Sequence, residues 1–253
     1  MSGHSAANSV RSLGIRWWLW AALGAALLWS GLVRVPLIVH AVSHLDSDLA
    51  VDGLTLIDSI QGRWRWHYPG TPHIASLPVL LSLPQSLALG ATPATLVSGG
   101  VVAYLLLVLA SFDLARQLGG TRVAIGTLIP LAFASNGMIW LSGRITGGHL
   151  VAAFWHAGAF GILARLLDAP SPRKALALGL WCGFGLYLDS MFLASILGVG
   201  VGLGVGLTTL RTKTGVIQSA LLVFVGIELA SRPGLRGTCG SLLSLRESVS
   251  TRS

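Results

Sequence analysis

The sequence contains few charged side chains. Its 253 residues include 17 Lys and Arg and 9 Asp and Glu, so 10% are charged, whereas a soluble domain carries roughly 25%. Hydrophobic residues make up 53% of the chain, and the mean hydropathy is +0.74. Because so few polar side chains cannot cover a surface that faces water, the composition excludes an ordinary soluble domain and predicts an integral membrane protein.

Cysteine is scarce, and common motifs of soluble enzymes are missing. The two cysteines, Cys182 and Cys239, exclude a disulfide framework. The sequence has no P-loop, no G-x-S-x-G and no H-E-x-x-H motif, which speaks against a nucleotide loop, a serine hydrolase and a zinc protease. The net charge of +8 is spread between apolar runs and forms no single stripe, so we expect no nucleic acid partner.

Apolar runs of about the length of a membrane span recur along the chain. We predict an all-α integral membrane protein, a multi-span helical bundle of about seven spans in contact with membrane lipids. Arg11 and Arg16 precede the first run, which predicts a cytoplasmic N-terminus and, for a bacterial protein, the inner (cell) membrane. The predicted spans are residues 17–38, 94–114, 123–141, 150–166, 175–189, 192–210 and 216–230.

Three segments need separate interpretation. Residues 17–38 are too long for the apolar part of a signal peptide, so we expect a retained span, with Arg34 reaching the outer interface. Residues 74–90 are apolar but short and contain two prolines, which predicts an interfacial or re-entrant helix. If this segment crossed the membrane instead, the predicted orientation of every later span would be reversed. We predict that residues 231–253, which are polar and rich in Ser and Arg, form a disordered tail after a transmembrane domain of residues 1–230.

The first outer loop, residues 40–75, holds four of the nine acidic residues. A helix over residues 45–60 would be amphipathic and would lie on the extracytoplasmic surface, with leucines and isoleucines toward lipid or toward the spans. Asp48 and Asp52 would face water one turn apart, where mutual repulsion can raise one pKa for proton transfer. The alternative is a plain solvated face. The polar side of this predicted helix consists of Asp48, Asp52, Thr55 and Ser59.

The stretch "RWRWHYPG" (63–70) follows this predicted helix. Arg63 and Arg65 carry guanidinium groups suited to a phosphate, and Trp64 and Trp66 carry rings suited to the membrane interface or to the flat face of a sugar. The alternative is an aromatic belt with arginines that reach to the headgroups.

The sequence "SDLAVDGLTLIDSIQGRWRWHYPGTPHIASLPVLL" (47–81) resembles the first outer loop of GT-C-type membrane glycosyltransferases, most closely the bacterial relatives of dolichyl-phosphate-mannose protein mannosyltransferases. Their motif has the form S-D-E-A-x-x-G-L, and the chain departs from it at Leu49, where the family has an acidic residue. Segments 142–150 ("SGRITGGHL") and 183–193 ("GFGLYLDSMFL") are also similar. The matching motif residues are Ser47, Asp48, Ala50, Gly53 and Leu54.

This resemblance implies a bundle that transfers a sugar from a polyprenyl-phosphate donor to the hydroxyl of a glycan, lipid or protein acceptor, with inversion, at the extracytoplasmic face. Asp48 would be the general base and Asp52 would orient or tune it. The phosphate would be held by Arg63, Arg65, Arg144 and His149. We assign no cofactor and no metal. Family members are about twice as long, so the resemblance also implies a truncated chain, which would be an inactive remnant if the missing half is needed.

Other interpretations remain open. A transporter or channel-like protein could guide a cation with Asp48, Asp52 and Asp189, although such proteins place carboxylates within spans and show inverted repeats, and neither pattern is visible. His40 and His44 have a metal-ligand spacing toward Asp48, but interfacial histidines more often form hydrogen bonds. The "TGGH" stretch before the fourth span is equally compatible with a tight turn between helices.

Overall fold

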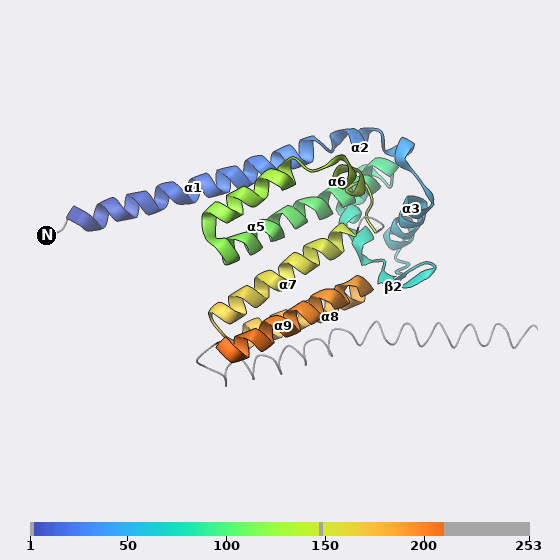
Figure 1. The fold of residues 1–253 in the computed structure, drawn as a ribbon. Coiled ribbons are helices and arrows are strands. Elements are labelled where there is room, and N and C mark those ends of the chain that lie inside the picture. Colours follow the sequence, from blue (N-terminus) through green and yellow to red (C-terminus); the bar gives the residue numbers. More distant parts are fainter. Residues whose placement is uncertain (1–2, 147–148, 210–253) are drawn as a thin grey trace, which may run out of the picture.

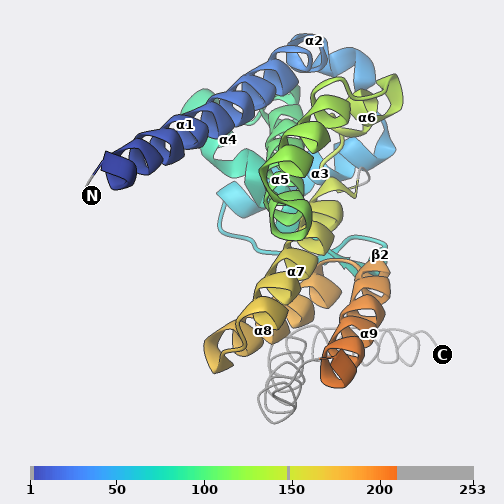
Figure 2. The same cartoon turned by 60° about the vertical axis from the view of Figure 1, so that its left-hand side comes forward.

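The computed structural model describes residues 3–146 and 149–209 of the chain. Almost all of this part is helical, as the composition predicts (Figure 1). Helix α1 contacts α5, α5 contacts α7, and α7 contacts both α8 and α9, so the long helices follow one another in a row (Figure 2). The predicted span 216–230 and the predicted tail 231–253 lie outside the described residues.

The first predicted span is helical but interrupted. Helix α1 (Gly3–Leu32) is followed by the short helix α2 (Val35–Val39), with a turn at Val33 and Arg34 between them. Pro36 lies in the first turn of α2, where a missing N–H does no harm. The apolar stretch Trp17–Val39 is long enough to cross a membrane, in agreement with the predicted span.

Helix α5 (Pro93–Ala132) begins at a capping box between Thr92 and Thr95 and doubles back on itself at Gly120. Gly120 has φ of 72° inside this element, a conformation that favours glycine. The Tyr104 hydroxyl donates to the Leu131 carbonyl, 27 residues later, over 2.5 Å. A straight helix would separate these residues by about 40 Å, so the two arms of α5 run side by side in opposite directions (Figure 1).

The second arm of α5 differs from the predicted span 123–141. It ends at Ala132, just after Pro130, and the short helix α6 (Asn136–Leu141) follows a break. A proline inside a helix removes one hydrogen bond and strains the preceding turn. This predicted span is therefore two helical pieces, whereas the predicted span 94–114 is one uninterrupted helical arm.

The second half of the described chain contains α7 (Leu150–Asp168), α8 (Pro172–Leu188), the 3₁₀ turn η3 (Ser190–Phe192) and α9 (Leu193–Thr209). Helices α8 and α9 have 17 residues each, or about 26 Å, slightly less than the roughly 30 Å of bilayer hydrocarbon. The described helices that are long and apolar enough to cross a membrane are Trp17–Val39, Pro93–Ala132 and Leu150–Asp168. These stretches support a membrane protein; the number of about seven spans stays a prediction.

Helices α7 and α8 are joined by a reciprocal tryptophan pair. Trp155 Nε1 donates to the Trp181 carbonyl over 2.7 Å, and Trp181 Nε1 donates to the Trp155 carbonyl over 2.8 Å. Their rings stack at 3.9 Å. Each ring lies against a glycine of the other helix, because a Cβ at Gly158 would meet Trp181 and a Cβ at Gly185 would meet Trp155.

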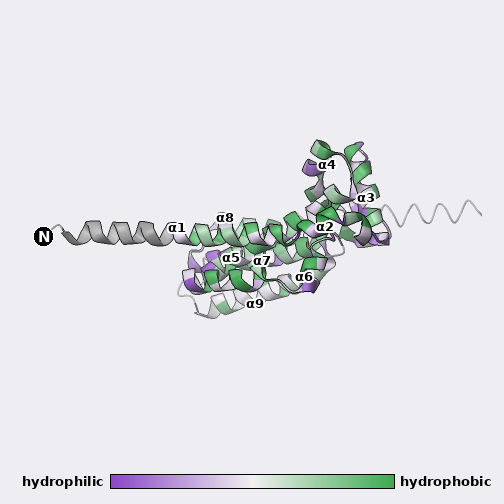
Figure 3. Cartoon of the chain, turned by 90° about the horizontal axis from the view of Figure 1, so that it is seen from above, coloured by the Kyte–Doolittle hydropathy of each residue, from purple (hydrophilic) through white to green (hydrophobic). Residues whose placement is uncertain are grey.

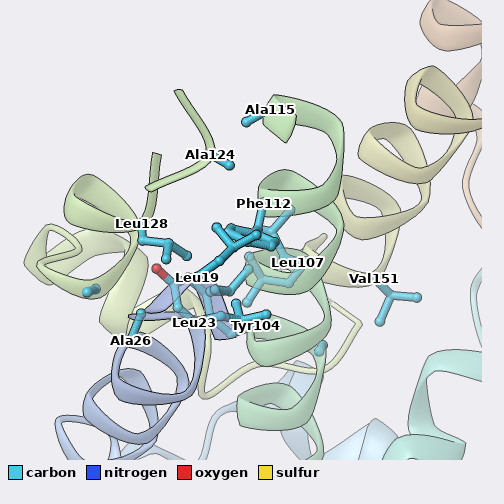
Figure 4. Packing of buried hydrophobic residues seen from close by; sticks show 14 of the residues in the cluster. Leu19, Leu23, Ala26, Tyr104, Leu107, Phe112, Ala115, Ala124, Leu128 and Val151 are labelled. Atoms are coloured by element: carbon cyan, nitrogen blue, oxygen red, sulfur yellow. The ribbon is translucent and has the colours of Figure 1, made fainter. Parts of the chain in front are cut away.

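The main apolar core lies between α1, the two arms of α5, and α7 (Figure 4). Leu19 and Leu23 of α1 lie against Tyr104 and Phe112 of α5 (Figure 4). A second core joins α7, α8 and α9. These two cores hold the long helices together, whereas a smaller third core around Leu49 lies at one end of the bundle.

Irregular elements gather at that end, beside α2 and α6 (Figures 1 and 3). Helix α3 (Ser47–Ile60) is followed by an antiparallel hairpin of β1 (His67–Tyr68) and β2 (Thr71–Ala75). The expectation of an all-α chain is therefore wrong for residues 67–75. Residues 74–90 do not form one helix: they comprise the end of β2, η2 (Leu77–Ser82) and α4 (Leu83–Leu89), because prolines begin both helical pieces.

Two adjacent glycines let other segments approach the first arm of α5 closely. A Cβ at Gly99 would lie 2.0 Å from Ser82 Oγ, and one at Gly100 would lie 2.4 Å from the Ser142 carbonyl oxygen. Real Cβ atoms do not approach backbone so closely. Gly100 therefore allows the backbone between α6 and α7 to rest directly on α5.

We expect Gly100→Ala to destabilise the protein by about 2 kcal/mol or more, because the Ser142 backbone must move to make room for a methyl group. Gly126→Ala in the second arm of the same helix is the matched control, since nothing lies within 4 Å of its Cβ position. That change should alter stability by less than about 1 kcal/mol. Thermal unfolding in detergent measures both variants, and equal effects would contradict this account of Gly100.

Candidate functional site

Most of the residues that the sequence singles out lie at the end of the bundle that carries α3 and the hairpin. Helix α3, the segment between α6 and α7, and the end of α8 supply the polar side chains. Asp48, Arg144 and His149 all belong to this region. The geometry divides them into two neighbouring clusters.

The first cluster forms around the beginning of α3. Asp46 caps the helix, because its Oδ1 accepts the Leu49 N–H over 3.0 Å. This hydrogen bond, with help from Arg144, lowers the pKa of Asp46. The cap places Asp48 in the first turn, where its side chain is 63% exposed. The Tyr68 hydroxyl donates to the Asp48 backbone carbonyl over 3.0 Å, so the hairpin is attached to this turn.

Arg144 is the cation of the first cluster. It forms an ion pair with Asp46, lies 3.9 Å from Asp48, and rests on the Trp140 ring at 4.0 Å. Its side chain is only 17% exposed, which fixes the guanidinium next to the two carboxylates. A small pocket of about 240 Å³, counted with its open mouth, is lined by Arg144, His44 and Trp140 together with Leu37, Leu49, Val97 and Gly143.

Asp52 lies in a different environment from the one predicted. It is 1% exposed and accepts hydrogen bonds from the Thr146 hydroxyl at 2.6 Å and the Thr146 N–H at 3.4 Å. Burial raises the pKa of Asp52 to about 6, although the bonds from Thr146 oppose this shift. The expectation that Asp48 and Asp52 both face water is therefore wrong for Asp52.

Beyond Asp48, protein covers the polar side of α3, so that Asp52, Thr55 and Ser59 are buried. The hydroxyls of Thr55 and Ser59 are satisfied within the helix, since they donate to the carbonyls of Val51 and Thr55 over 2.8 Å. The buried residues of α3 are Leu49, Asp52, Thr55, Leu56 and Ser59, and its exposed apolar residues include Leu54, Ile57 and Ile60. The expected wet polar face is thus wrong beyond Asp48. The apolar side chains lie as expected, either against protein (Leu49 and Leu56) or at the surface (Ile57 and Ile60).

Arg63 and Arg65 are engaged elsewhere. Both pair with Asp58, at 2.6 Å and 2.9 Å, and these bonds, the one from Arg63 above all, lower the pKa of the Asp58 carboxyl. The pairing joins the loop after α3 to the last turn of that helix. The structure brings Arg144 to Asp48, but it gives Arg63 and Arg65 a carboxylate partner of their own.

The second cluster is formed by His149 and Asp189. His149 precedes α7 in a left-handed conformation, with φ of 50°. Its Nδ1 lies 2.8 Å from Asp189 Oδ2, and Asp189 Oδ1 accepts the Met191 N–H over 2.9 Å. Asp189 also forms a β-bridge with Ile74, so the hairpin reaches the end of α8.

Arg34 does not reach the interface as expected but is fully buried. Its Nε donates to Ser142 Oγ over 2.7 Å, one Nη donates to the Ser30 carbonyl over 2.7 Å, and its guanidinium covers the Tyr104 ring at 3.4 Å. An arginine inside the bundle is better satisfied by these groups than by lipid.

Sequence reasoning missed the parts played by Asp46, Tyr68 and Thr146. Asp46 had a recognisable signal, because an aspartate directly before a helix is a common cap. Tyr68 and Thr146 had none, since their partners are 20 and 94 residues away. In the described residues, no group of three or more His, Cys, Asp and Glu could hold a metal ion, and this includes His40 and His44.

Comparison with models of known protein families, with curated proteins and with solved structures gave no match.

Asp52→Asn should remove a pH dependence of stability. Because folding raises the pKa of Asp52 from 3.8 to about 6, its contribution to stability is fully present below about pH 4 and is lost as the pH rises through 6. The shift corresponds to a loss of about 3 kcal/mol, and asparagine cannot ionise. Denaturation in detergent at pH 4, 5, 6 and 7 measures the slope.

The control for this slope is Asp58→Asn, which changes an ion-paired carboxylate of the same helix. The wild-type decline between pH 4 and 6 should persist in that variant and disappear in Asp52→Asn. Parallel slopes in wild type and Asp52→Asn would contradict the burial argument.

Proposed function

We propose that this protein transfers a sugar from a polyprenyl-phosphate donor to an acceptor hydroxyl at the extracytoplasmic face of a membrane. One observation carries this proposal: the first turn of α3 holds the exposed carboxylate of Asp48 beside the guanidinium of Arg144. The resemblance of residues 47–81 to the first outer loop of GT-C-type glycosyltransferases supports the same reaction. Asp48 is the residue on which geometry and motif agree.

In the proposed reaction Asp48 is the general base. Its carboxylate takes the proton of the acceptor hydroxyl while that oxygen attacks the anomeric carbon of the donor. The bond between this carbon and the phosphate oxygen breaks, and polyprenyl phosphate leaves with the electron pair. The result is a new glycosidic bond with inverted configuration, and no cofactor is consumed.

Arg144 is the residue that stabilises the leaving phosphate in this proposal. A fixed cation near developing negative charge is worth most where water is scarce. Asp46 and Trp140 hold the guanidinium in position before any donor binds, which reduces the cost of ordering it. We assign this role to Arg144 because it lies 3.9 Å from Asp48, whereas Arg63 and Arg65 are held at Asp58, at the other end of α3.

The orientation in the membrane follows from the sequence. Arg11 and Arg16 place the start of α1 on the cytoplasmic side by the positive-inside rule. Helix α3 and the hairpin lie at the opposite end of α1 (Figure 1), so the proposed site faces outward. Exposed apolar side chains at this end, such as Leu54 and Ile57, suit contact with lipid and with a polyprenyl chain.

The test is sugar transfer by membranes that contain the full chain, supplied with radiolabelled polyprenyl-phosphate hexose. Asp48→Asn should lower the release of label from the lipid by about 100-fold or more, because general-base catalysis contributes at least that much. The matched control is Asp58→Asn, which removes from the other end of the same helix a carboxylate paired with Arg63 and Arg65, and it should leave release unchanged.

Release that survives Asp48→Asn would remove Asp48 from the role of base. Equal loss in both variants would show that α3 is merely damaged. No release by a folded wild-type chain would overturn the proposed function itself.

A further inference from the structure

A second pocket lies beside His149, between β2, η2, α7 and the end of α8. It encloses about 250 Å³, counted with its open mouth. Its wall is mostly apolar, with Ile74, Pro78, Val151 and Leu188 among its residues, and its polar groups come from Thr146, His149 and Asp189. The pocket that Arg144 lines has none of these residues in common with it.

Asp189 fixes the state of the His149 ring. The carboxylate can only accept, so His149 Nδ1 carries the hydrogen of their 2.8 Å bond. In a neutral imidazole the other nitrogen, Nε2, is then an acceptor. The Asp189 side chain is held in this orientation, because it is 7% exposed and its second oxygen accepts the Met191 N–H.

Within residues 3–146 and 149–209, the acceptor atom of His149 has no hydrogen-bond partner. No described residue forms a hydrogen bond with Nε2, and the His149 side chain is 45% exposed. Thr146 offers no competing donor, because its hydroxyl is committed to Asp52. The pocket therefore presents one oriented acceptor on an otherwise apolar wall, which is the usual composition of a small-molecule site.

The charges around the pocket select against ions. Lysine and arginine are missing from the described residues that line it, and the nearest fixed charge is the Asp189 carboxylate. An anion would be repelled by that carboxylate. A cation finds no free oxygen on it, because Asp189 Oδ2 accepts the His149 Nδ1–H and Oδ1 accepts the Met191 N–H. A neutral ligand with a hydroxyl can donate a hydrogen bond to Nε2, and its apolar part can pack against the apolar residues of the pocket.

We propose that this pocket binds a neutral alcohol. The hydroxyl of the alcohol donates a hydrogen bond to His149 Nε2, and the apolar part of the alcohol packs against Ile74, Val151 and Leu188. The binding stands on this geometry alone. It does not rest on the proposed function, because a hydroxyl that donates its hydrogen to His149 cannot also donate it to Asp48.

The test compares two probes of similar size and shape, cyclohexanol and methylcyclohexane, which differ in the hydroxyl. The full chain is studied at pH 8 in dodecylphosphocholine micelles, because this detergent has no hydroxyl to compete. The readout is NMR of the His149 ring and of the methyl groups of Ile74 and Val151. Cyclohexanol should shift these signals saturably and bind at least tenfold more tightly than methylcyclohexane.

Variants then locate the hydrogen bond. His149→Phe keeps a ring but removes the acceptor, so cyclohexanol binding, followed on the methyl groups, should weaken at least tenfold while methylcyclohexane is unaffected. His73→Phe is the matched control. His73 lies in β2 next to Ile74, but its side chain is exposed and does not line the pocket. Equal binding of the two probes by wild type, or cyclohexanol binding that survives His149→Phe, would overturn the proposal.

A parallel assay of donor turnover separates this inference from the proposed function. Cyclohexanol binding in a protein that never releases label from polyprenyl-phosphate hexose leaves the site standing and overturns the transferase. Turnover without cyclohexanol binding keeps the transferase and overturns the site.

Discussion

The buried guanidinium of Arg34 makes the interactions on which the end of the bundle that carries α3 depends. A charge inside an apolar bundle is costly unless its surroundings satisfy it. Arg34 meets most of this requirement by bonding to the Ser30 carbonyl and to Ser142 Oγ and by lying on the Tyr104 ring, while one Nη has no hydrogen-bond partner among the described residues. These partners belong to α1, to α5 and to the turn after α6, so a single side chain fixes three separate parts of the chain relative to one another.

From Ser142 the chain leads directly to the functional side chains. Gly100 lets the Ser142 backbone rest on α5, and Arg144 and Thr146 follow within four residues. Arg144 then bonds to the start of α3 and Thr146 bonds to its middle. The position of Asp48 is thus set from two sides, by its own helix and by a segment almost 100 residues later. Loops placed by a rigid scaffold commonly carry function in this way.

Local rules predicted much of the fold but less of the site. The apolar runs indicated the stretch Trp17–Val39 and the helices beginning at Pro93 and Leu150, because length and composition decide such spans. The motif around Ser47 placed Asp48 in a helical first turn. Periodicity also grouped Asp52 with Asp48, but it cannot say whether water or protein covers a face. Thr146 decides that point, and the sequence gives no sign of so distant a partner.

The reciprocal bonds of Trp155 and Trp181 bear on how the chain enters a membrane. An indole N–H has no water to bond with in lipid, and each ring here depends on a carbonyl of the other helix. Helix α8 alone would expose an unsatisfied donor and is short for a bilayer. The indole donors of Trp155 and Trp181 are therefore satisfied only while α7 and α8 are paired, and of these two helices α7 is the one long and apolar enough to cross a membrane.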